Sequence, residues 1–344
     1  MAPRPISDED LQYILTHTQP LWDELRGQRI FVTGGTGFFG CWLLESFCFV
    51  NRSLALNARA TVLTRDPAKF AAKCPHIAVD AAITLLAGDV RTFEFPNGEF
   101  PFVVHAATET SGSQSPFELL SSIVAGTERT LQFAASHGAR KFLLTSSGAI
   151  YGRQPSEITH LPETYAGAPN PLAPASAYAE GKRTSELLCA LYQQANPALE
   201  CKIARCWAFC GPHLPLDAHF AIGNFIGDAL AGRPIAIGGD GTPQRSYLYG
   251  ADLAIWLWTM LFRAPSLVPI NVGSGQAVSI LELAEIVAAT LAPTTPITLA
   301  KQTVPGVPPA RYVPSVERAA ELLNLRPTIS LEESIRRTAA WHRS

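Results

Sequence analysis

One short segment near the start of the chain restricts its fold more than any other. The apolar run Arg29–Thr33 is followed by the glycine-rich turn Gly34–Gly40 and then by a stretch with the apolar pattern of a helix. Between a strand and a helix, Gly34 permits a tight bend, Gly37 lets the backbone approach a pyrophosphate, and Gly40 allows close packing of helix on strand. The first N–H groups of such a helix bind anions. The G-x-x-G-x-x-G spacing therefore predicts a dinucleotide site, and the alternative is a tight turn without a ligand.

The ends of the second and third predicted strands bear on which dinucleotide binds. An acidic residue at the tip of the second strand favours NAD, because it holds the ribose 2′-hydroxyl. Here the strand Ala60–Thr64 is followed by Arg65, which suits the 2′-phosphate of NADP or the adenine ring, and Asp66 lies two positions beyond the strand. NAD and NADP therefore both stay open. Asp89, after the third strand, is placed either to accept a hydrogen bond from the adenine amino group or to cap a helix.

Apolar strands and helices alternate from residue 28 to residue 210, which indicates a parallel sheet buried on both faces. We predict a doubly wound α/β Rossmann sheet with a smaller C-terminal α/β substrate-binding domain. An N-terminal helical extension is expected over residues 1–27, the dinucleotide-binding domain over 28–210, and mainly the substrate-binding domain over 211–344, with some segments free to return to the Rossmann domain. The predicted strands are Arg29–Thr33, Ala60–Thr64, Ile83–Ala87, Phe102–Ala106, Lys141–Ser146 and Lys202–Trp207, and the main helices are Ser7–Leu25, Gly37–Val50, Pro116–His137, Ser176–Gln194, Ala218–Ala231 and Ser279–Leu291.

The composition excludes several classes of protein. Hydrophobic residues make up 47% of the 344 residues and charged residues 16%, which excludes a disordered chain. A net charge of −2 provides no basic surface for nucleic acid. The apolar run Leu253–Phe262 is shorter than the roughly 20 residues of a membrane span, and no secretory signal is visible, so we expect a cytoplasmic protein without membrane contact. Seven cysteines without a C-x-x-C pair predict neither a disulfide framework nor a metal, and Cys206 and Cys210 are expected in the core.

A second motif carries acid–base chemistry. Tyr178 and Lys182 are four residues apart in a predicted helix, and this spacing places both side chains on one helical face. A lysine there is expected to lower the tyrosine pKa and to reach a cofactor ribose, while the tyrosine exchanges a proton with an alcohol or a carbonyl. Ser147 follows the fifth predicted strand, at the sheet edge where ligands bind. Thr145 and Ser146 are alternatives for this hydroxyl, and the non-catalytic alternative is a capping serine beside a surface tyrosine.

Together these motifs resemble the extended short-chain dehydrogenase/reductase family, in its nucleotide-sugar epimerase/dehydratase branch. The resemblance runs from about Gln28 to the C-terminus. The order of the motifs is specific to the family but says little about the reaction. The segments that carry it are Thr33–Gly40, Gly88–Val90, His105–Ala107, Ser146–Gly152, Tyr178–Lys182, Gly211–Pro212, Gly239–Gly241, Arg245–Tyr249, Asp252–Ala254 and Asn271–Gly273.

The resemblance implies where most site residues lie. It implies a nucleotide-diphosphate sugar in the cleft between the two domains and a catalytic set of Ser147, Tyr178 and Lys182. It also implies that Arg245 and Arg311 hold the nucleotide diphosphate, the alternative being ordinary surface ion pairs. Thr108 and Asn224 complete the expected substrate contacts, and the expected cofactor contacts are Gly34, Thr36, Gly37, Phe38, Phe39, Arg65, Asp89, Val90, Ala106, Ala107, Thr145, Tyr178 and Lys182.

Several residues depart from the family pattern. Dehydratases and the related sugar decarboxylases usually carry an acidic residue just after the catalytic hydroxyl, where this chain has Gly148 and Ala149. Asparagines that many members carry are replaced by Ile123 and Ala208, which predicts an altered substrate contact or a different substrate class. Glu109 is the one carboxylate near the predicted site that is placed for acid–base work.

These residues predict an NAD(P)-dependent enzyme that modifies a nucleotide-diphosphate sugar. Because the dehydratase acid is absent, we expect epimerisation through a transient keto intermediate, with Tyr178 as acid and base. The alternatives are a dehydratase that uses Glu109 and an NADPH-dependent reductase of a keto-sugar or another carbonyl. The intact pair of Tyr178 and Lys182 disfavours a non-enzymatic dinucleotide-binding regulator. The helices Pro116–His137 and Ser176–Gln194 resemble those that pair across a two-fold axis in this family, so we expect a homodimer.

Overall fold

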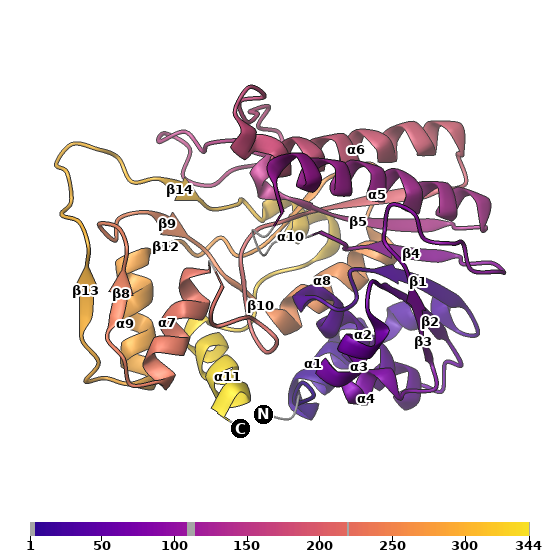
Figure 1. Ribbon diagram of the computed structural model, residues 1–344, viewed down its shortest axis with the longest axis horizontal. Coiled ribbons are helices and arrows are strands. Elements are labelled where there is room, and N and C mark those ends of the chain that lie inside the picture. Colours follow the sequence, from indigo (N-terminus) through magenta and orange to yellow (C-terminus); the bar gives the residue numbers. More distant parts are fainter. Residues whose placement is uncertain (1–3, 109–113, 219, 344) are drawn as a thin grey trace.

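A seven-stranded parallel sheet forms the centre of the protein (Figure 1), and the computed structural model describes residues 4–108, 114–218 and 220–343. Its strands are β1 (Arg29–Thr33), β2 (Arg59–Thr64), β3 (Ile83–Ala87), β4 (Phe102–His105), β5 (Lys141–Ser147), β6 (Glu200–Cys206) and β11 (Ile270–Val272). The order β11-β6-β5-β4-β1-β2-β3 runs in opposite directions on the two sides of β1, which is the arrangement of a doubly wound sheet. The predicted fold class is confirmed.

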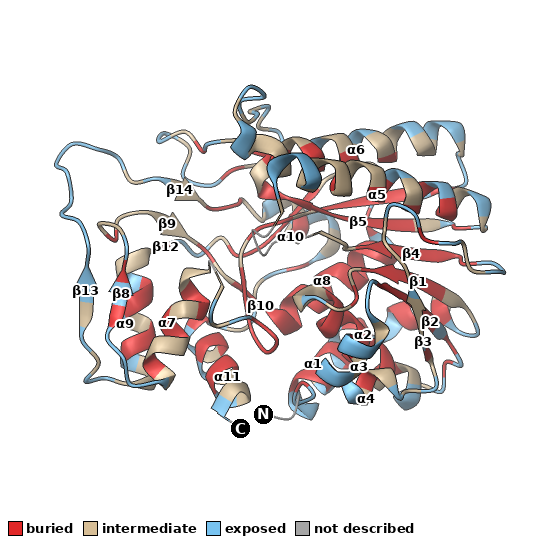
Figure 2. Ribbon diagram, viewed as in Figure 1, coloured by how far each residue is buried: buried red, intermediate tan, exposed pale blue. Residues whose placement is uncertain are grey.

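Helices cover both faces of this sheet (Figure 1). α5 (Pro116–Ser136) and α6 (Ala177–Ala195) pack against each other over β4, β5 and β6. α2 (Phe38–Ser53) and α8 (Gly250–Arg263) pack together on the opposite face. α8 is buried along nearly its whole length (Figure 2), which accounts for the apolar run Leu253–Phe262. Within the three described ranges, no helix is both long and apolar enough to cross a bilayer.

Local sequence signals set the ends of these elements. Ser115 begins α5 with a capping box, in which its hydroxyl accepts from the Glu118 N–H while the Glu118 carboxylate accepts from the Ser115 N–H. Pro116 occupies the first turn, where a missing N–H costs nothing. All four residues of β4 are buried, as expected for a strand covered on both faces. Because β4 pairs in parallel with both β1 and β5, the carboxyl ends of these three strands lie at one edge of the sheet.

A smaller unit with its own hydrophobic core lies beside the large sheet (Figure 1). Its helices pack around a two-stranded sheet, and a three-stranded sheet lies between this unit and the large one. The chain also returns to the large sheet in α8 and β11. The elements of the smaller unit are α7 (Ala221–Leu230), α9 (Ile280–Leu291), α11 (Leu331–Arg343), β8 (Ile235–Ile237), β13 (Ile297–Leu299), β9 (Gln244–Arg245), β12 (Val278–Ser279) and β14 (Arg311–Tyr312). The remaining short elements are α3 (Pro67–Lys73), α4 (Pro75–Ala78), α10 (Glu317–Leu323), β7 (Phe209–Cys210) and β10 (Leu248–Tyr249).

The N-terminal helix α1 (Asp8–Thr18) joins the two units. Ser7 caps it by accepting from the Asp10 N–H, and the helix packs on α8 and α2. The buried Asp10 carboxylate accepts from the Tyr249 hydroxyl at 2.7 Å and pairs with Arg337 of α11. A buried carboxylate needs such partners, because an unpaired charge in the interior is costly. The two ends of the chain consequently lie near each other (Figure 1).

Candidate active site

The glycine-rich turn has the geometry that its sequence predicts. Gly34 has a φ of +72°, and a Cβ there would lie 2.3 Å from the carbonyl oxygen of Ala106. A Cβ on Gly40 would lie 2.3 Å from the backbone of Gly35, so the helix packs too closely for a side chain. A Cβ on Gly37 would instead meet, among the described atoms, only the Gly34 oxygen at 3.6 Å. The backbone at Gly37 therefore faces open space at the start of α2, which fits a bound phosphate.

The residues around this turn are held by protein contacts. Thr36 lies in the turn, and its carbonyl oxygen accepts from the Lys73 ammonium at 2.9 Å. Phe38 and Phe39 begin α2, and their rings lie 6.5 Å and 4.9 Å from the ring of Phe209. The turn is thus supported from behind by α3 and from the side by β7.

The acidic residues at the strand tips are engaged with neighbouring groups. The Asp66 carboxylate caps α3 by accepting from the Lys69 N–H at 2.9 Å. The Asp89 carboxylate accepts from the Arg91 guanidinium at 2.8 Å, and this bond lowers the Asp89 pKa. Arg65 also makes an interaction within the protein. Both carboxylates thus accept hydrogen bonds from the protein itself. The roles of Arg65 and Asp89 in cofactor binding stay predictions.

Val90, Ala106, Ala107 and Thr145 line the same edge of the sheet. Val90 contacts α5 so closely that a Cβ on Gly126 would lie 2.8 Å from its side chain. The Ala106 N–H donates to the Thr33 carbonyl oxygen, which continues the pairing of β4 with β1. These contacts fix the backbone beside the glycine turn, where the cofactor contacts are expected.

Ser147, Tyr178 and Lys182 come together at the end of β5. The Ser147 hydroxyl accepts from the Ala149 N–H at 3.1 Å, and it lies close enough to Tyr178 of α6 to act on the pKa of its phenol. The Lys182 ammonium is 2% exposed and donates to the Thr108 hydroxyl at 2.6 Å and to the Thr145 carbonyl oxygen at 2.8 Å. Burial lowers the Lys182 pKa to about 8, because it penalises the charged form.

The pKa of Tyr178 differs from the sequence expectation. We expected Lys182 to lower it, whereas the pKa of Tyr178 is raised. Burial raises it, and the opposing effect of Ser147 is too weak to compensate. Lys182 directs its ammonium to Thr108 and Thr145 instead. Tyr178 is therefore a neutral phenol near pH 7, in the form of a general acid.

A second phenol, which is not among the predicted site residues, lies beside Ser147 and Tyr178. Tyr312 of β14 also lies near the Ser147 hydroxyl, and its pKa is raised by burial and by the nearby Tyr178. Its ring lies 4.4 Å from that of Trp207. The signal was present in the sequence, because Tyr312 immediately follows the predicted site residue Arg311.

Trp207 packs against the residue that follows Ser147. A Cβ on Gly148 would lie 2.6 Å from the Trp207 indole, so this position accepts no larger side chain while the indole is in place. The indole N–H donates to the Asn271 side-chain oxygen at 3.2 Å, which holds the ring. The space into which a side chain at Gly148 would project is therefore occupied by an aromatic ring.

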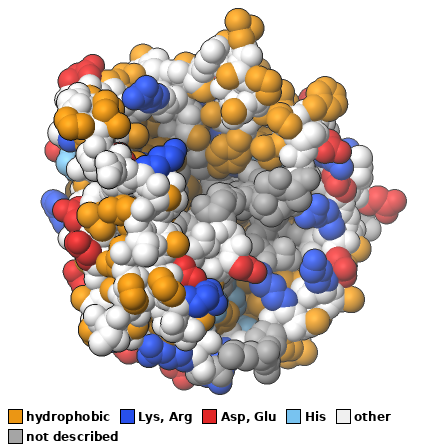
Figure 3. Space-filling model, turned by 60° about the vertical axis from the view of Figure 1, so that its left-hand side comes forward, with side chains coloured by type: hydrophobic (Ala, Val, Ile, Leu, Met, Phe, Trp, Pro, Cys, Tyr) orange, Lys and Arg blue, Asp and Glu red, His pale blue; other side chains and the backbone are white. Residues whose placement is uncertain are grey.

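The predicted substrate residues come from several elements. In the pairing of β9 with β14, Arg245 is opposite Tyr312, and its guanidinium carbon lies 5.9 Å from the Tyr312 ring centre. Arg311 donates to the Gln244 side-chain oxygen at 2.8 Å and to the Ser156 carbonyl oxygen at 3.1 Å. The face seen in Figure 3 is hollowed near its centre, with several Lys and Arg side chains around the hollow. Asn224 lies in the first turn of α7 and is half-buried, whereas Glu109 lies outside the described residues.

A buried polar chain lies behind the site. His105, at the end of β4, contacts the Thr33 hydroxyl at 2.7 Å and the Thr127 hydroxyl at 3.1 Å. Thr127 in turn contacts the Ser185 hydroxyl at 2.8 Å. Burial, helped by the charge of Lys182, lowers the His105 pKa to about 3. The imidazole is therefore neutral and links β1 and β4 to the two helices that cover them.

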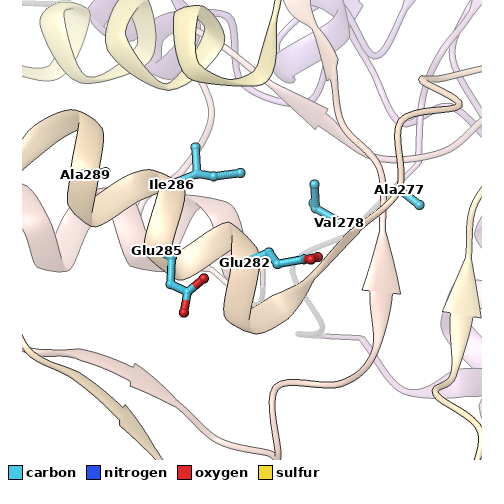
Figure 4. Close-up of a pocket in the computed structure, with 6 residues that line it drawn as sticks. All are labelled: Ala277, Val278, Glu282, Glu285, Ile286 and Ala289. Atoms are coloured by element: carbon cyan, nitrogen blue, oxygen red, sulfur yellow. The ribbon is translucent and has the colours of Figure 1, made fainter.

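A separate depression of about 440 Å³ lies on the smaller unit (Figure 4). Two carboxylates line it, and anionic side chains disfavour a phosphate ligand. It contains no predicted site residue. The lining residues are Ala277, Val278, Glu282, Glu285, Ile286 and Ala289, which lie in and beside β12 and α9.

Comparisons with known proteins agree with this site. Residues 30–273 match the NAD dependent epimerase/dehydratase family. The chain is 32% identical over 319 residues to UDP-glucuronic acid decarboxylase 1 of Arabidopsis thaliana, covering 92% of this chain and 70% of that protein. It is 28% identical over 319 residues to UDP-glucuronic acid decarboxylase 1 of Xenopus tropicalis, covering 92% and 72%.

Solved structures agree in fold. The NAD-dependent NDP-hexosamine 5,6-dehydratase TunA, of tunicamycin biosynthesis, matches with a TM-score of 0.73 and 26% identity, over 92% of this chain and 98% of that one. The epimerase Mth375 of Methanothermobacter thermautotrophicus matches with a TM-score of 0.76 over 96% of both chains, and its 22% identity supports the fold alone. The predicted resemblance and enzyme class are confirmed. The chain belongs to the NAD-dependent epimerase/dehydratase family and is an enzyme of that type.

Proposed function

We propose that this protein epimerises a nucleotide-diphosphate sugar through a transient keto intermediate. The observation that carries the proposal is the pairing of Tyr178 with Ser147 beside an aromatic wall. Neither Gly148 nor Ala149 provides the acid that dehydratases and decarboxylases usually carry after this hydroxyl, and Trp207 leaves no room for a larger side chain at Gly148. The site therefore supplies one acid–base group for a hydroxyl, which is what epimerisation at a hydroxyl-bearing carbon needs.

The proposed reaction uses the phenol twice. Tyr178 and Ser147 contact the hydroxyl of the sugar carbon that changes configuration. A nicotinamide held at the glycine turn would supply the hydride acceptor and donor for that carbon. In its tyrosinate form, Tyr178 takes the hydroxyl proton as the carbonyl forms and returns it when the hydroxyl forms again. The cycle consumes neither protons nor electrons once the phenol has released its own proton to the solvent. Lys182 holds a positive charge one helical turn from the phenol, which favours the tyrosinate that this cycle requires.

The cofactor fits the chain at the glycine turn. The open backbone at Gly37 and the start of α2 would hold the pyrophosphate, and Lys182 would hold the nicotinamide ribose. The choice between NAD and NADP depends on the 2′ position, near Arg65. Denaturing the purified protein and weighing the released dinucleotide by mass spectrometry decides between them, because NADP carries one additional phosphate.

The substrate is proposed to bind across the two units. The guanidinium of Arg245 would pair with the diphosphate, because its planar fork matches phosphate oxygens. Arg311 would support the nucleotide side, and Thr108 and Asn224 would contact the sugar. The net charge of −2 cannot attract an anionic substrate over long distances, so its capture depends on these local contacts.

A second candidate is decarboxylation of UDP-glucuronic acid. The relatives named UDP-glucuronic acid decarboxylase favour it, since one of them is 32% identical to this chain. The absence of a carboxylate at Gly148 and Ala149 argues against it, and Trp207 leaves no room for a larger side chain at Gly148. UDP-glucuronic acid with an intact carboxylate would remain a substrate for epimerisation under the first proposal.

One experiment separates these reactions. UDP-, GDP-, CDP- and dTDP-sugars, including UDP-glucuronic acid, are incubated with the protein without added cofactor, and the products are identified by NMR. Epimerisation gives a stereoisomer of unchanged mass. Decarboxylation releases carbon dioxide, dehydration lowers the mass by one water, and reduction requires added NADPH. Turnover of none of the panel by protein that contains its dinucleotide would overturn the epimerase proposal.

We also propose a homodimer that forms through α5 and α6. Leu187 and Leu191 lie one turn apart on α6 and keep 58% and 50% of their surface exposed, and Phe117 in the first turn of α5 keeps 82%. Leucines four residues apart form an apolar stripe, which a second copy of the helix pair would cover. Sedimentation velocity is expected to show a dimer, and Leu187→Glu with Leu191→Glu is expected to give a monomer. A wild-type monomer at micromolar concentration would contradict the proposal.

A further inference from the structure

A cluster of metal-ligating side chains lies behind the glycine turn, outside the site described above. Cys41 is in α2, Cys74 lies between α3 and α4, and His213 is in the segment that follows β7. One potential ligand atom from each of the three lies within 4.8 Å of the other two, and all three residues are buried. We propose that Cys41, Cys74 and His213 bind a zinc ion.

The spacing of the two sulfurs fits this metal. The Sγ atoms of Cys41 and Cys74 are 3.9 Å apart. Zinc–sulfur bonds of about 2.3 Å at a tetrahedral angle place two sulfurs about 3.8 Å apart. Two thiolates and an imidazole are soft and borderline ligands, which favour zinc over magnesium or calcium. The ligands are therefore close to binding positions without a rearrangement of the backbone.

The surroundings of His213 resemble those of a metal ligand. Its Nε2 lies 2.7 Å from a carboxylate oxygen of Glu45, which is also buried. A carboxylate that accepts from one ring nitrogen fixes the imidazole and leaves the other nitrogen with the lone pair that a metal needs. His213 also has a φ of +69°, a conformation that is uncommon for residues other than glycine. Such strain persists only where the surroundings hold it, and it is concentrated at functional sites.

A further imidazole lies beside the cluster without belonging to it. His76 follows Cys74 by two residues, and its Nε2 lies 3.1 Å from the Glu45 carboxylate that also contacts His213. Its ligand atoms do not join those of Cys41, Cys74 and His213 within 4.8 Å of one another. The proposal therefore rests on these three ligands alone.

The ion would connect three parts of the chain that also support the cofactor turn. Cys41 lies one helical turn beyond Gly37, and Lys73, beside Cys74, donates to the Thr36 carbonyl oxygen at 2.9 Å. The Glu45 carboxylate accepts from the Ile6 N–H at 2.6 Å, which adds the N-terminal segment. Binding would replace the two thiol protons, which pass to the solvent, and would stabilise the folded protein. The role of the ion is structural, because none of its ligands belongs to the Ser147 and Tyr178 site.

Metal analysis tests the proposal directly. The protein is expressed with zinc in the medium, purified under reducing conditions, freed of any histidine tag and analysed for metal by mass spectrometry. We expect about one zinc per chain in the wild type, and less than a fifth of that in Cys41→Ser and Cys74→Ser. Cys48→Ser is the matched control, since Cys48 is a buried cysteine of the same helix that does not belong to the cluster. His213→Asn removes the imidazole while an asparagine tolerates positive φ and can still donate to Glu45.

Cobalt provides a readout that does not depend on how the variants fold. The wild-type protein, stripped with a chelator under reducing conditions, is titrated with Co²⁺, which gives thiolate charge-transfer and tetrahedral bands in a site of this kind. These bands, and a rise in the thermal midpoint on adding zinc, are expected in the wild type and in Cys48→Ser. Wild-type protein without bound zinc and without cobalt bands would overturn the proposal. A loss of 2 Da from a Cys41–Cys74 disulfide in metal-free protein that also gives no cobalt bands would overturn it in favour of a redox pair.

Discussion

The candidate site has two walls that are built in different ways. The catalytic wall consists of Ser147, Tyr178 and Lys182, which β5 and α6 carry at the edge of the seven-stranded sheet. The substrate wall consists of Arg245, Arg311 and Tyr312, which lie on strands of only two residues each. Ser147 and Lys182 are buried, whereas the three residues of the substrate wall are half-buried. The residues proposed for the chemistry are thus carried by the seven-stranded sheet and its covering helix, and those proposed for recognition by a three-stranded sheet.

The two walls meet at a single hydroxyl. The Ser147 hydroxyl lies close to Tyr178 of the catalytic wall and to Tyr312 of the substrate wall, and it acts on the pKa of both phenols. Burial raises the pKa of both phenols, so both are protonated near pH 7. The two phenols differ in their neighbours, because only Tyr178 shares a helical face with Lys182. This difference predicts that the catalytic wall carries the proton transfer and that the substrate wall positions the sugar.

The largest expected effect tests that division directly. Tyr178→Phe is expected to lower kcat by about 1,000-fold, as is typical for the loss of a general acid–base group. Tyr312→Phe removes the same oxygen from the other wall and is expected to change kcat by less than about tenfold. Both rates are measured on the substrate found in the panel, with bound dinucleotide and thermal midpoint as controls. Equal losses in the two variants would mean that both phenols transfer protons.

The next effect concerns binding by the substrate wall. Arg245→Ala is expected to raise KM about 30-fold with little change in kcat, because it removes charge-assisted hydrogen bonds that contribute about 2 kcal/mol. Arg233→Ala is the matched control, since Arg233 is on the same unit and pairs only at the surface with Asp228. Steady-state kinetics measures both. A loss confined to kcat in Arg245→Ala would place this arginine in the chemical step.

The pH dependence of activity tests the charge in the catalytic wall. Because the Lys182 pKa is lowered to about 8, its ammonium loses its charge as the pH rises above 8, while the Tyr178 pKa is raised and its phenol stays neutral. We expect kcat/KM at pH 9 to be about tenfold below its plateau. Lys182→Arg keeps its charge over this range and is expected to lose this decline, whereas Lys182→Met is expected to be slow at every pH. The same decline in Lys182→Met would assign it to another group.

The sequence predicts the catalytic wall better than the substrate wall, because the catalytic signals are local. The glycine turn and the four-residue spacing of Tyr178 and Lys182 each lie within one strand–helix unit. Tyr312 enters the site only through the pairing of β14 with β9, whose residues Arg311 and Gln244 are 67 positions apart. No periodicity in the sequence indicates such a pairing.

Two further differences between the sequence predictions and the structure have identifiable causes. The predicted helix Ser7–Leu25 ends as α1 at Thr18 and continues as a tighter 3-10 helix, because Pro20 lacks the N–H that a helix interior needs. The sequence predicts a lowered Tyr178 pKa because the spacing of the motif reveals only the charge of Lys182. Burial outweighs that charge, and burial depends on the whole fold rather than on the spacing of two residues.

The smallest effect on activity is expected behind the catalytic wall, at His105. Its pKa is about 3 in the folded protein and about 6.5 in an unfolded chain, so only the unfolded chain takes up a proton between these values. Stability is therefore lost as the pH falls below 6.5, by about 2 kcal/mol between pH 7 and pH 5. His105→Asn can keep one hydrogen bond to Thr33 or Thr127 but does not titrate, so its thermal midpoint should fall less over this range than that of the wild type. Because His105 lies behind the reacting groups, kcat at pH 7 should change less than about threefold. Equal pH dependence of the two thermal midpoints would show that this imidazole does not couple the sheet to α5 through its neutral form.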